Sequence, residues 1–487
     1  MIDFLYQKRI IFVVLVYSLA VYFSSGYYHF DEHFQLIEFA GLKLGINTPS
    51  DMPWEYQSQL RPALQPLIVY LICKVFMLVG FYNPFAIAFF LRLISAILAL
   101  FASLAFYRVF ENEIKNEKHR KIFFLLNIFL WFAVFNKVRF TSENWSASIF
   151  MIAIYVYFLK DRKQIINILF SGLLLGISFI IKFQLGFFIA GFCAWLFFIK
   201  KENIKSLMLL IFGILIAISI GVIIDYWFYQ QWVFTAWNYL QQLLFAKYVG
   251  SFENEPWWYF FDETFNKTIP PFSIAFMLSF VFVFFFKPKH ILTWILFPFL
   301  LIHFFIGHKE IRFLFPVIPF MPFLLVYSHE VLIEKFANYR TIVQRKVPKF
   351  FISLFWISNT IFLLIITFKS ADSQISLYKT IYDKYDGNVV IYYIENNPYH
   401  RVLDIHYYKK ENVRFQHIDS IQQVKLKINS TAIFVTEQPS LCLGNNIMVI
   451  EVYNTFPLWI KKFNYNNWLA RSKSWHAFEL KEKSNNL

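Results

Sequence analysis

The sequence predicts an α-helical polytopic membrane protein that ends in a small soluble α/β domain. Of its 487 residues, 58% are hydrophobic and only 16% are charged, which is more apolar surface than a soluble core can bury. Long apolar runs recur up to about residue 370, and after Ser370 the runs shorten to strand length. We therefore expect lipid to cover the first part of the chain and water to surround the second.

The apolar runs are candidates for transmembrane helices, because a bilayer span needs about 20 mainly apolar residues. They lie near residues 9–27, 64–82, 84–108, 121–138, 145–160, 164–181, 184–199, 206–227, 270–286, 290–306, 312–329 and 350–368. The first run lacks a small-residue cleavage site, so we interpret it as a retained helix rather than a signal peptide. These runs predict about 11–13 transmembrane helices.

The charge pattern predicts how these helices are oriented. The net charge of +15 comes mostly from short loops between apolar runs, which is typical of cytoplasmic loops and not of a nucleic-acid partner. Those loops are residues 8–9, 111–121, 160–163, 200–205, 287–290 and 335–349. The opposite face then carries residues 28–62, 139–144, 182–184, 226–269, 307–312 and the chain after 369. Two full spans between residues 64 and 108 would place the basic 111–121 loop on the non-cytoplasmic side. We therefore expect a broken or partly inserted helix within residues 64–160.

The C-terminal part predicts a small soluble domain at residues 371–487, after a transmembrane domain at residues 1–370. Four strand-length apolar runs occur there, at Asn388–Ile394, Val413–His417, Ala432–Thr436 and Ile447–Tyr453. Helix-length polar segments separate the first three runs, which favours an α/β arrangement on the non-cytoplasmic side. The lone Cys442 of this region cannot crosslink it, so disulfides do not hold the domain together.

The first predicted outer loop opens with two adjacent carboxylates flanked by two histidines, in the segment His29–Gln35, followed by Glu38. Ionisable groups directly after a transmembrane helix are costly unless they face water, a metal or a substrate. We therefore interpret the segment as a functional site. Asp31 is suited to act as a general base that deprotonates a hydroxyl, with its neighbours tuning its pKa.

Two alternatives remain open for this loop. An interfacial amphipathic helix would place Phe34, Ile37 and Leu44 on its apolar side. A metal site would use His29, Asp31 and His33, although their spacing is not a specific ligand pattern.

A second charged cluster, His308–Phe313, lies on the same predicted face between two apolar runs. Lys309 and Arg312 suit an anion, because arginine offers a bidentate fork and lysine a compact charge for phosphate. The alternative is a basic loop whose side chains snorkel to the interface. Positive charge on this face runs against the general loop bias, which favours the functional interpretation.

Other polar and aromatic residues on the predicted outer face suggest a polar cleft. Arg61, Arg139 and Lys182 occur there, and each taken singly fits an interhelical hydrogen bond equally well. The stretch Asp225–Tyr239 and the shorter Pro256–Phe260 are rich in aromatic residues. Such stretches form either an aromatic belt at the membrane interface or a groove for a lipid tail or a sugar ring.

Six segments, in this order, resemble the lipid-linked-sugar mannosyltransferases of glycosyltransferase family 22. That family has a His-Pro-Asp-Glu-x-Phe-Gln motif in its first loop, which stands here as His29–Gln35 with Phe30 for proline. The His-Lys-Glu-x-Arg-Phe segment is intact at His308–Phe313. Looser matches, each with substitutions, are Trp54–Arg61, Arg139–Asn144, Asp225–Tyr239 and Pro256–Tyr259. The resemblance does not extend beyond Ser370.

The resemblance implies a GT-C fold and an inverting sugar transfer from a polyprenyl-phosphate donor, usually dolichyl-phosphate mannose. It implies Asp31 as the base with Glu32 as its partner, and Lys309 and Arg312 as cations for the donor phosphate. The residues expected to bind substrate are His29, His33, Gln35, Arg61, Arg139, Lys182, Asp225, Tyr229, Asn238, Trp257, His308, Lys309, Glu310 and Arg312. A lipid-monophosphate leaving group does not obviously require a divalent metal, so we expect no metal and no other cofactor.

The predicted function is transfer of a mannosyl residue from a polyprenyl-phosphate sugar to a glycan or lipid-linked glycan acceptor. We expect it at the non-cytoplasmic face of a bacterial inner membrane, or of the endoplasmic reticulum membrane in a eukaryote. The alternatives are transfer of another sugar, a lipid-glycan transporter or flippase, and a non-catalytic binding protein whose soluble domain carries the function.

Overall fold

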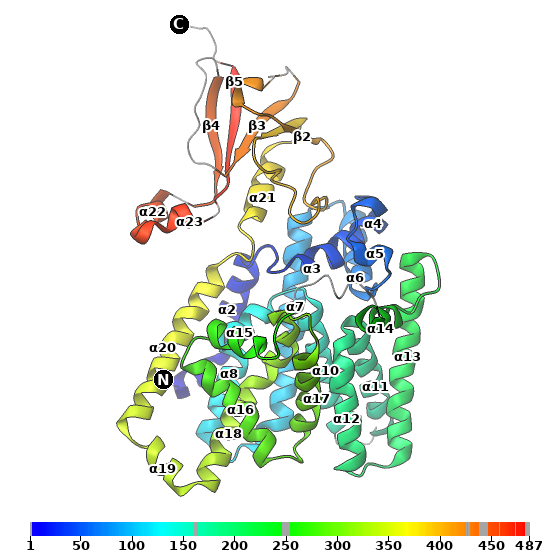
Figure 1. Cartoon of the computed structure of the whole chain (residues 1–487), viewed down its shortest axis with the longest axis vertical. Helices are drawn as coiled ribbons and strands as arrows, with labels where there is room; N and C mark the ends of the chain where they lie inside the picture. The colour runs from blue at the N-terminus through cyan, green and yellow to red at the C-terminus, as the bar shows by residue number, and fades with distance from the viewer. Residues whose placement is uncertain are drawn as a thin grey trace. The chain divides into compact units, whose positions relative to one another are not determined.

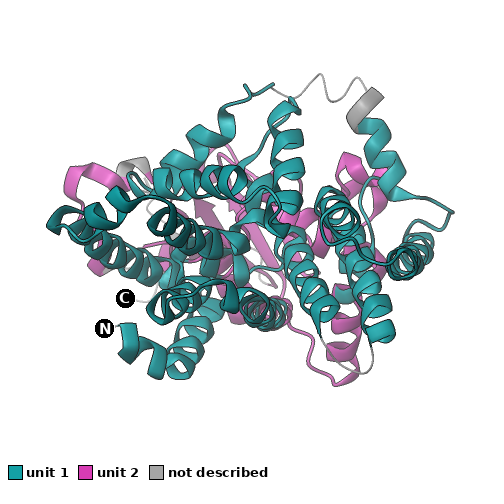
Figure 2. Ribbon diagram, turned by 90° about the horizontal axis from the view of Figure 1, so that it is seen from below, with its two compact units in different colours: residues 1–24, 58–68, 90–369 teal, residues 25–57, 69–89, 370–487 magenta. Residues whose placement is uncertain are grey.

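The computed structural model describes residues 2–159, 164–245, 254–424, 426, 429–437, 447–456, 458–472 and 474–482. The predicted basic loop 160–163 and Cys442 lie outside these residues. Two compact units make up the chain, coloured separately in Figure 2. The helical unit contains residues 1–24, 58–68 and 90–369, and the sheet unit contains residues 25–57, 69–89 and 370–487.

The helical unit consists mostly of helices (Figure 1). In chain order they are α1 (Ile2–Gln7), α2 (Arg9–Phe23), α7 (Pro84–Phe110), α8 (Glu117–Phe129), α9 (Trp131–Lys137), α10 (Ser142–Phe158), α11 (Gln164–Ile181), η4 (Phe183–Leu185), α12 (Gly186–Phe198), α13 (Ile204–Tyr229), α14 (Thr235–Phe245), α15 (Tyr259–Lys267), α16 (Phe272–Phe286), α17 (Ile291–Phe305), η6 (Ile311–Phe320), α18 (Met321–Lys335), α19 (Ala337–Val343) and α20 (Lys346–Phe368). Helix α7 starts in the sheet unit, and α6 (Leu64–Leu78) also has residues in both units.

These helices make the chain a multi-pass membrane protein. Among the described residues, five helices are long and apolar enough to cross a bilayer, and a sixth crossing results if the bent pair α16 and α17 is one span. The shorter apolar helices Arg9–Phe23, Leu64–Leu78 and Phe183–Phe198 fall below that length. The number of about 11–13 crossings therefore stays a prediction.

Two predicted apolar runs are interrupted. The run at 121–138 breaks at Leu130 into α8 and α9, in the region where we expected a broken helix. The run at 312–329 begins as the 3-10 helix η6. Pro316 and Pro319 lie inside η6, and because proline has no backbone N–H, it cannot continue an α-helical ladder there.

Helices α11 and α13 pack at unusually close range, because glycines line their contact. A Cβ atom added to Gly172 would lie 2.2 Å from the carbonyl oxygen of Leu210, and one added to Gly176 would lie 2.6 Å from the Cβ of Ala217. Small residues let two helix backbones approach in this way inside a membrane.

The sheet unit holds a mixed five-stranded sheet with the strand order β2-β1-β3-β5-β4. Its strands are β1 (Val389–Tyr393), β2 (Val413–His417), β3 (Thr431–Thr436), β4 (Ile447–Asn454) and β5 (His476–Glu482). Strand β1 pairs in parallel with β2 and β3, and β5 pairs antiparallel with β3 and β4. The four predicted strands are confirmed, and β5 is an addition that the sequence did not indicate.

Short helices complete the sheet unit. They are α3 (Phe30–His33), the π-helical turn η1 (Phe34–Glu38), α4 (Phe39–Leu44), η2 (Pro49–Asp51), α5 (Trp54–Gln57), α21 (Gln374–Lys384), η7 (Ile421–Gln423), α22 (Leu458–Lys461), η8 (Tyr465–Asn467) and α23 (Trp468–Arg471). The helices expected between the first three strands are wrong: in the described residues, turns follow β1 and only η7 follows β2. The turn at 399–408 buries Tyr399, Ile405, Tyr407 and Tyr408, and this packing takes the place of a helix.

Replacing Gly172 by valine tests the close packing of α11 against α13. The added side chain cannot fit against the Leu210 carbonyl, and we expect a loss of about 1–3 kcal/mol in stability. The measurement is the thermal unfolding midpoint in detergent. The exposed Ile166 on the same helix supplies the control I166V, and equal midpoints for both variants would contradict the packing argument.

Candidate active site

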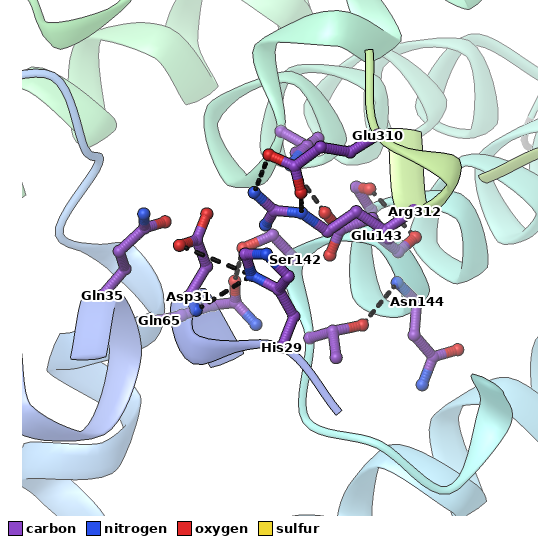
Figure 3. A network of polar contacts seen from close by, with 12 residues as sticks. His29, Asp31, Gln35, Gln65, Ser142, Glu143, Asn144, Glu310 and Arg312 are labelled. Atoms are coloured by element: carbon purple, nitrogen blue, oxygen red, sulfur yellow. Dashed lines mark hydrogen bonds and ion pairs between the residues drawn. The ribbon is translucent and has the colours of Figure 1, made fainter. Parts of the chain in front are cut away.

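The first-loop cluster consists of His29, Asp31, Glu32, His33, Gln35 and Glu38. Helix α3 begins here because the Nδ1 atom of His29 accepts a hydrogen bond from the backbone N–H of Asp31 at 3.2 Å (Figure 3). The Asp31 carboxylate lies 3.6 Å from the same nitrogen and is partly exposed. Glu32 accepts the N–H of Tyr28 at 3.1 Å. The Asp31 carboxylate is thus accessible to solvent, and the side chains of His29 and Glu32 hold the backbone around it by hydrogen bonds.

The other members of the first-loop cluster are buried. The Nε2 atom of His33 lies 2.9 Å from the Glu38 carboxylate, in hydrogen-bond contact, with 0% and 1% of the two side chains exposed. Gln35 donates to Glu55 at 3.0 Å. Burial raises the pKa of the Glu38 carboxyl, but hydrogen bonds from His33 and the Tyr407 backbone outweigh it and hold the pKa below its ordinary value. In this structure the side chains of His33 and Gln35 are therefore hydrogen-bonded to other residues of the protein, Glu38 and Glu55.

The cation cluster consists of Glu143, Lys182, His308, Glu310 and Arg312. Arg312, at the start of η6, donates from Nε and Nη2 to the two carboxylate oxygens of Glu310 at 2.5 and 3.0 Å (Figure 3). His308 lies 3.2 Å from the same carboxylate. This bidentate pair fixes the plane of the guanidinium.

Glu143 and Lys182 bring a second, buried ion pair to the cation cluster. The Nζ atom of Lys182 lies 2.7 Å from the Glu143 carboxylate, and both side chains are almost fully buried. Burial raises the pKa of Glu143, but the charges of Lys182 and Arg312 outweigh it and hold that pKa below its ordinary value. Three predicted residues, Lys182, Glu310 and Arg312, therefore lie close together with Glu143. The sequence placed Glu143 only among the outer-face polar residues of the Arg139–Asn144 segment, and it did not indicate the pairing with Lys182.

Two further predicted residues, Lys309 and Arg139, contact other groups of the protein. The ammonium of Lys309 donates to the backbone carbonyls of Glu255 and Ile306, at 2.8 and 2.5 Å. Arg139 is buried, and its guanidinium lies 4.0 Å from the ring centroid of Phe135. Lys309 therefore joins two loop backbones in this structure.

Three other predicted residues hold the backbone of residues 59–63. Asp225 accepts the N–H of Ala63 at 2.8 Å, the hydroxyl of Tyr229 donates to the carbonyl of Arg61 at 2.8 Å, and Asn238 donates to the carbonyl of Gln59 at 3.3 Å. These contacts fix the backbone segment that carries Arg61. Trp257 is 60% exposed and packs against Trp258 and Phe261.

Within the described ranges, no group of three or more His, Cys, Asp or Glu side chains is placed to hold a metal ion. His29, Asp31 and His33 therefore do not form the metal site considered as an alternative.

Residues 9–402 match a family described as the Alg9-like mannosyltransferase family. GPI alpha-1,2-mannosyltransferase 3 of Bos taurus is 25% identical over 61% of this chain and 54% of its own length. The same protein of Homo sapiens is 24% identical over 57% of this chain and 50% of its own. GPI mannosyltransferase 3 of Candida albicans is 25% identical over 63% and 61%. The chain thus spans about half the length of the first two relatives.

A solved structure has the same fold. ArnT from Cupriavidus metallidurans, bound to undecaprenyl phosphate, matches with a TM-score of 0.55 and 10% identity, over 96% of this chain and 97% of that one. This likeness confirms the predicted GT-C fold.

Replacing Glu143 by glutamine tests the buried pair of the cation cluster. The change leaves the Lys182 ammonium buried without its counter-ion, and we expect a loss of about 3–5 kcal/mol in stability. The double variant E143Q/K182Q should recover part of the stability that E143Q loses. Glu117, in an exposed pair with Lys121, supplies the control E117Q, which should change the unfolding midpoint little.

The same pair predicts a pH dependence. Because the folded-state pKa of Glu143 is lowered, its ionised form stabilises the fold above the ordinary carboxyl pKa, and this contribution is lost as the pH falls through the folded pKa. Between about pH 6 and about pH 3, the unfolding midpoint of the wild type should fall further than that of E143Q. Parallel declines would show that Glu143 contributes no such stabilisation.

Proposed function

Because the chain belongs to the Alg9-like mannosyltransferase family, we propose that it transfers a mannosyl residue from a polyprenyl-phosphate sugar to a glycan or lipid-linked glycan acceptor. The observation that carries this proposal is the Glu310–Arg312 pair, which presents a fixed guanidinium within the intact His308–Phe313 segment. The names of the relatives, GPI mannosyltransferases, support a glycolipid acceptor. The undecaprenyl phosphate bound to ArnT supports a lipid-phosphate donor.

The proposed reaction needs one base and one stabilised leaving group. Asp31 removes the proton of the acceptor hydroxyl while that oxygen attacks the anomeric carbon. The bond from that carbon to the phosphate oxygen breaks, and the lipid monophosphate leaves with the bonding electron pair. Attack opposite the leaving group inverts the anomeric configuration. Glu32 holds the loop backbone through Tyr28 and so keeps Asp31 in place.

The developing charge on the phosphate requires fixed cations. We assign the principal contact to Arg312, because its guanidinium is already oriented by Glu310. Lys182 adds positive charge close to it, balanced by Glu143. Lys309 donates two of its three N–H groups to carbonyls, so we give it a supporting role at the phosphate.

The remaining predicted residues are proposed to shape the substrate site. His29, His33 and Gln35 belong to the first-loop cluster, and His308 belongs to the cation cluster. The backbone that carries Arg61 is held by Asp225, Tyr229 and Asn238. Arg139 and Trp257 stay candidates for contacts with the glycan or the lipid.

We propose that the reaction takes place on the non-cytoplasmic face. The basic loops are predicted on the opposite face from the candidate residues, and basic loops are typical of the cytoplasmic side. The membrane would be the bacterial inner membrane, or that of the endoplasmic reticulum in a eukaryote. Transfer of another sugar from a polyprenyl phosphate is the second candidate, since the undecaprenyl phosphate bound to ArnT supports a lipid-phosphate donor without specifying the sugar.

Replacing Asp31 by asparagine tests the base. The amide cannot accept the proton, so we expect kcat to fall about 100-fold to 10,000-fold, as for loss of a general base. Transfer from a polyprenyl-phosphate mannose to a glycolipid acceptor is the measurement. Asp383, exposed on α21, supplies the control D383N. A folded D31N protein with wild-type kcat would remove Asp31 from this role.

Replacing Arg312 by lysine tests the phosphate contact. The charge stays but the bidentate fork is lost, so we expect the donor KM to rise about 10-fold or more. The assay varies donor at saturating acceptor and is accompanied by an unfolding midpoint. The exposed Arg340 gives the matched control R340K. An unchanged donor KM and kcat in R312K would exclude Arg312 as the phosphate ligand.

A further inference from the structure

We propose that Glu38 is a positioning residue through which the C-terminal domain takes part in catalysis. Its buried carboxylate holds the loop that carries Asp31 to the 399–408 turn of that domain. We call this contact the Glu38 junction, formed by His33, Glu38, Asn47, His406 and Tyr407. The inference rests on the proposed function, because it concerns the placement of the proposed base.

Four donors converge on the Glu38 carboxylate. One oxygen lies 2.9 Å from His33 Nε2 and accepts the backbone N–H groups of His406 and Tyr407, at 2.9 and 3.1 Å. The other oxygen accepts Asn47 Nδ2 at 2.9 Å. A carboxylate that is 1% exposed is costly to bury unless its charge is compensated in this way. Two of the four donors come from the C-terminal domain, so the loop depends on that domain for a satisfied charge.

The junction lies next to Asp31 along the chain. His33 ends the short helix α3, two residues after Asp31. Its ring stacks on Tyr27 and on Tyr408, with centroids 5.1 and 5.4 Å apart. Glu38 itself ends the π-helical turn η1, a backbone form that occurs frequently at functional sites. A shift of Glu38 or His33 would therefore move helix α3, which carries Asp31.

The 399–408 turn is itself anchored. The hydroxyl of Tyr407 lies 3.9 Å from the Cys73 sulfur, and the ring of Tyr408 stacks on Phe85 at 4.9 Å. Arg401 pairs with Asp372 at 2.9 Å, and the backbone N–H groups of Ala371 and Asp372 donate to the carbonyl of Ser25. The C-terminal domain thus binds the chain at Ser25, just before the first loop, and again at Glu38 within it.

Glu38 does not touch substrate in this proposal, because its carboxylate is buried and its hydrogen bonds are made within the protein. Its effect is geometric. A general base must lie within hydrogen-bond reach of the proton it removes, and a misplacement of about 1 Å can cost about 100-fold in rate.

The test compares full-length E38Q, D31N and the control E479Q in lipid nanodiscs. Glu479 is a mostly buried carboxylate of the same unit that pairs with Lys384 and Tyr385 and makes no contact with the first loop in the part of the chain that the structure describes. We expect E38Q to lower kcat about 10-fold to 100-fold, with the donor KM changed less than about 2-fold and hydrogen exchange of residues 29–35 increased. E479Q should change none of these values.

Wild-type kcat and exchange in a folded E38Q protein would overturn the proposal. If E38Q does not fold, Y408L decides, because it removes the ring stacked on His33 and leaves the carboxylate and its donors in place. Lower kcat with faster exchange in folded Y408L supports the proposal, and unchanged values reject it. Full activity in D31N would instead reject the base assignment, whereas the exchange result for E38Q still reports on the junction.

Discussion

Charge removed from water must be paired, and this constraint determines how the scarce ionisable groups of the chain are arranged. Glu38 with His33, Glu143 with Lys182, and Glu310 with Arg312 are the pairs around which the candidate residues are built. In each pair a carboxylate fixes a neighbouring cation or backbone segment. Pairing thus gives rigidity at positions where a sugar transferase would need a base and a phosphate ligand held in place.

The pairing also separates side chains that hold the protein from those suited to chemistry. Asp225, Tyr229 and Asn238 bind the backbone of residues 59–63, and Lys309 binds two carbonyls. Asp31 is only partly buried, and its backbone is held by His29. The abundance of polar residues in the motifs therefore reflects support for the site as much as contact with substrate.

The sequence predicted the helical membrane part, four of the five strands and the GT-C fold, because hydropathy and motif order are local signals. It missed β5, whose segment His476–Glu482 mixes polar and apolar residues, and it predicted helices where the 399–408 turn packs through its tyrosines. The Glu143–Lys182 pair and the Glu38 junction join residues distant in sequence, and a single sequence carries no signal for such pairs. Site residues could thus be named from motifs, but their partners could not.

The sheet unit suggests why a soluble domain accompanies the membrane helices. Residues 25–57, which include Asp31, fold together with the C-terminal domain and not with the helical unit. Transfer from a lipid phosphate is tested most directly by incubating purified protein with dolichyl- or undecaprenyl-phosphate mannose and, separately, with GDP-mannose. We predict mannose transfer and release of the lipid phosphate only with the polyprenyl donors. Transfer from GDP-mannose, with no transfer from the polyprenyl donors, would contradict a lipid-phosphate donor.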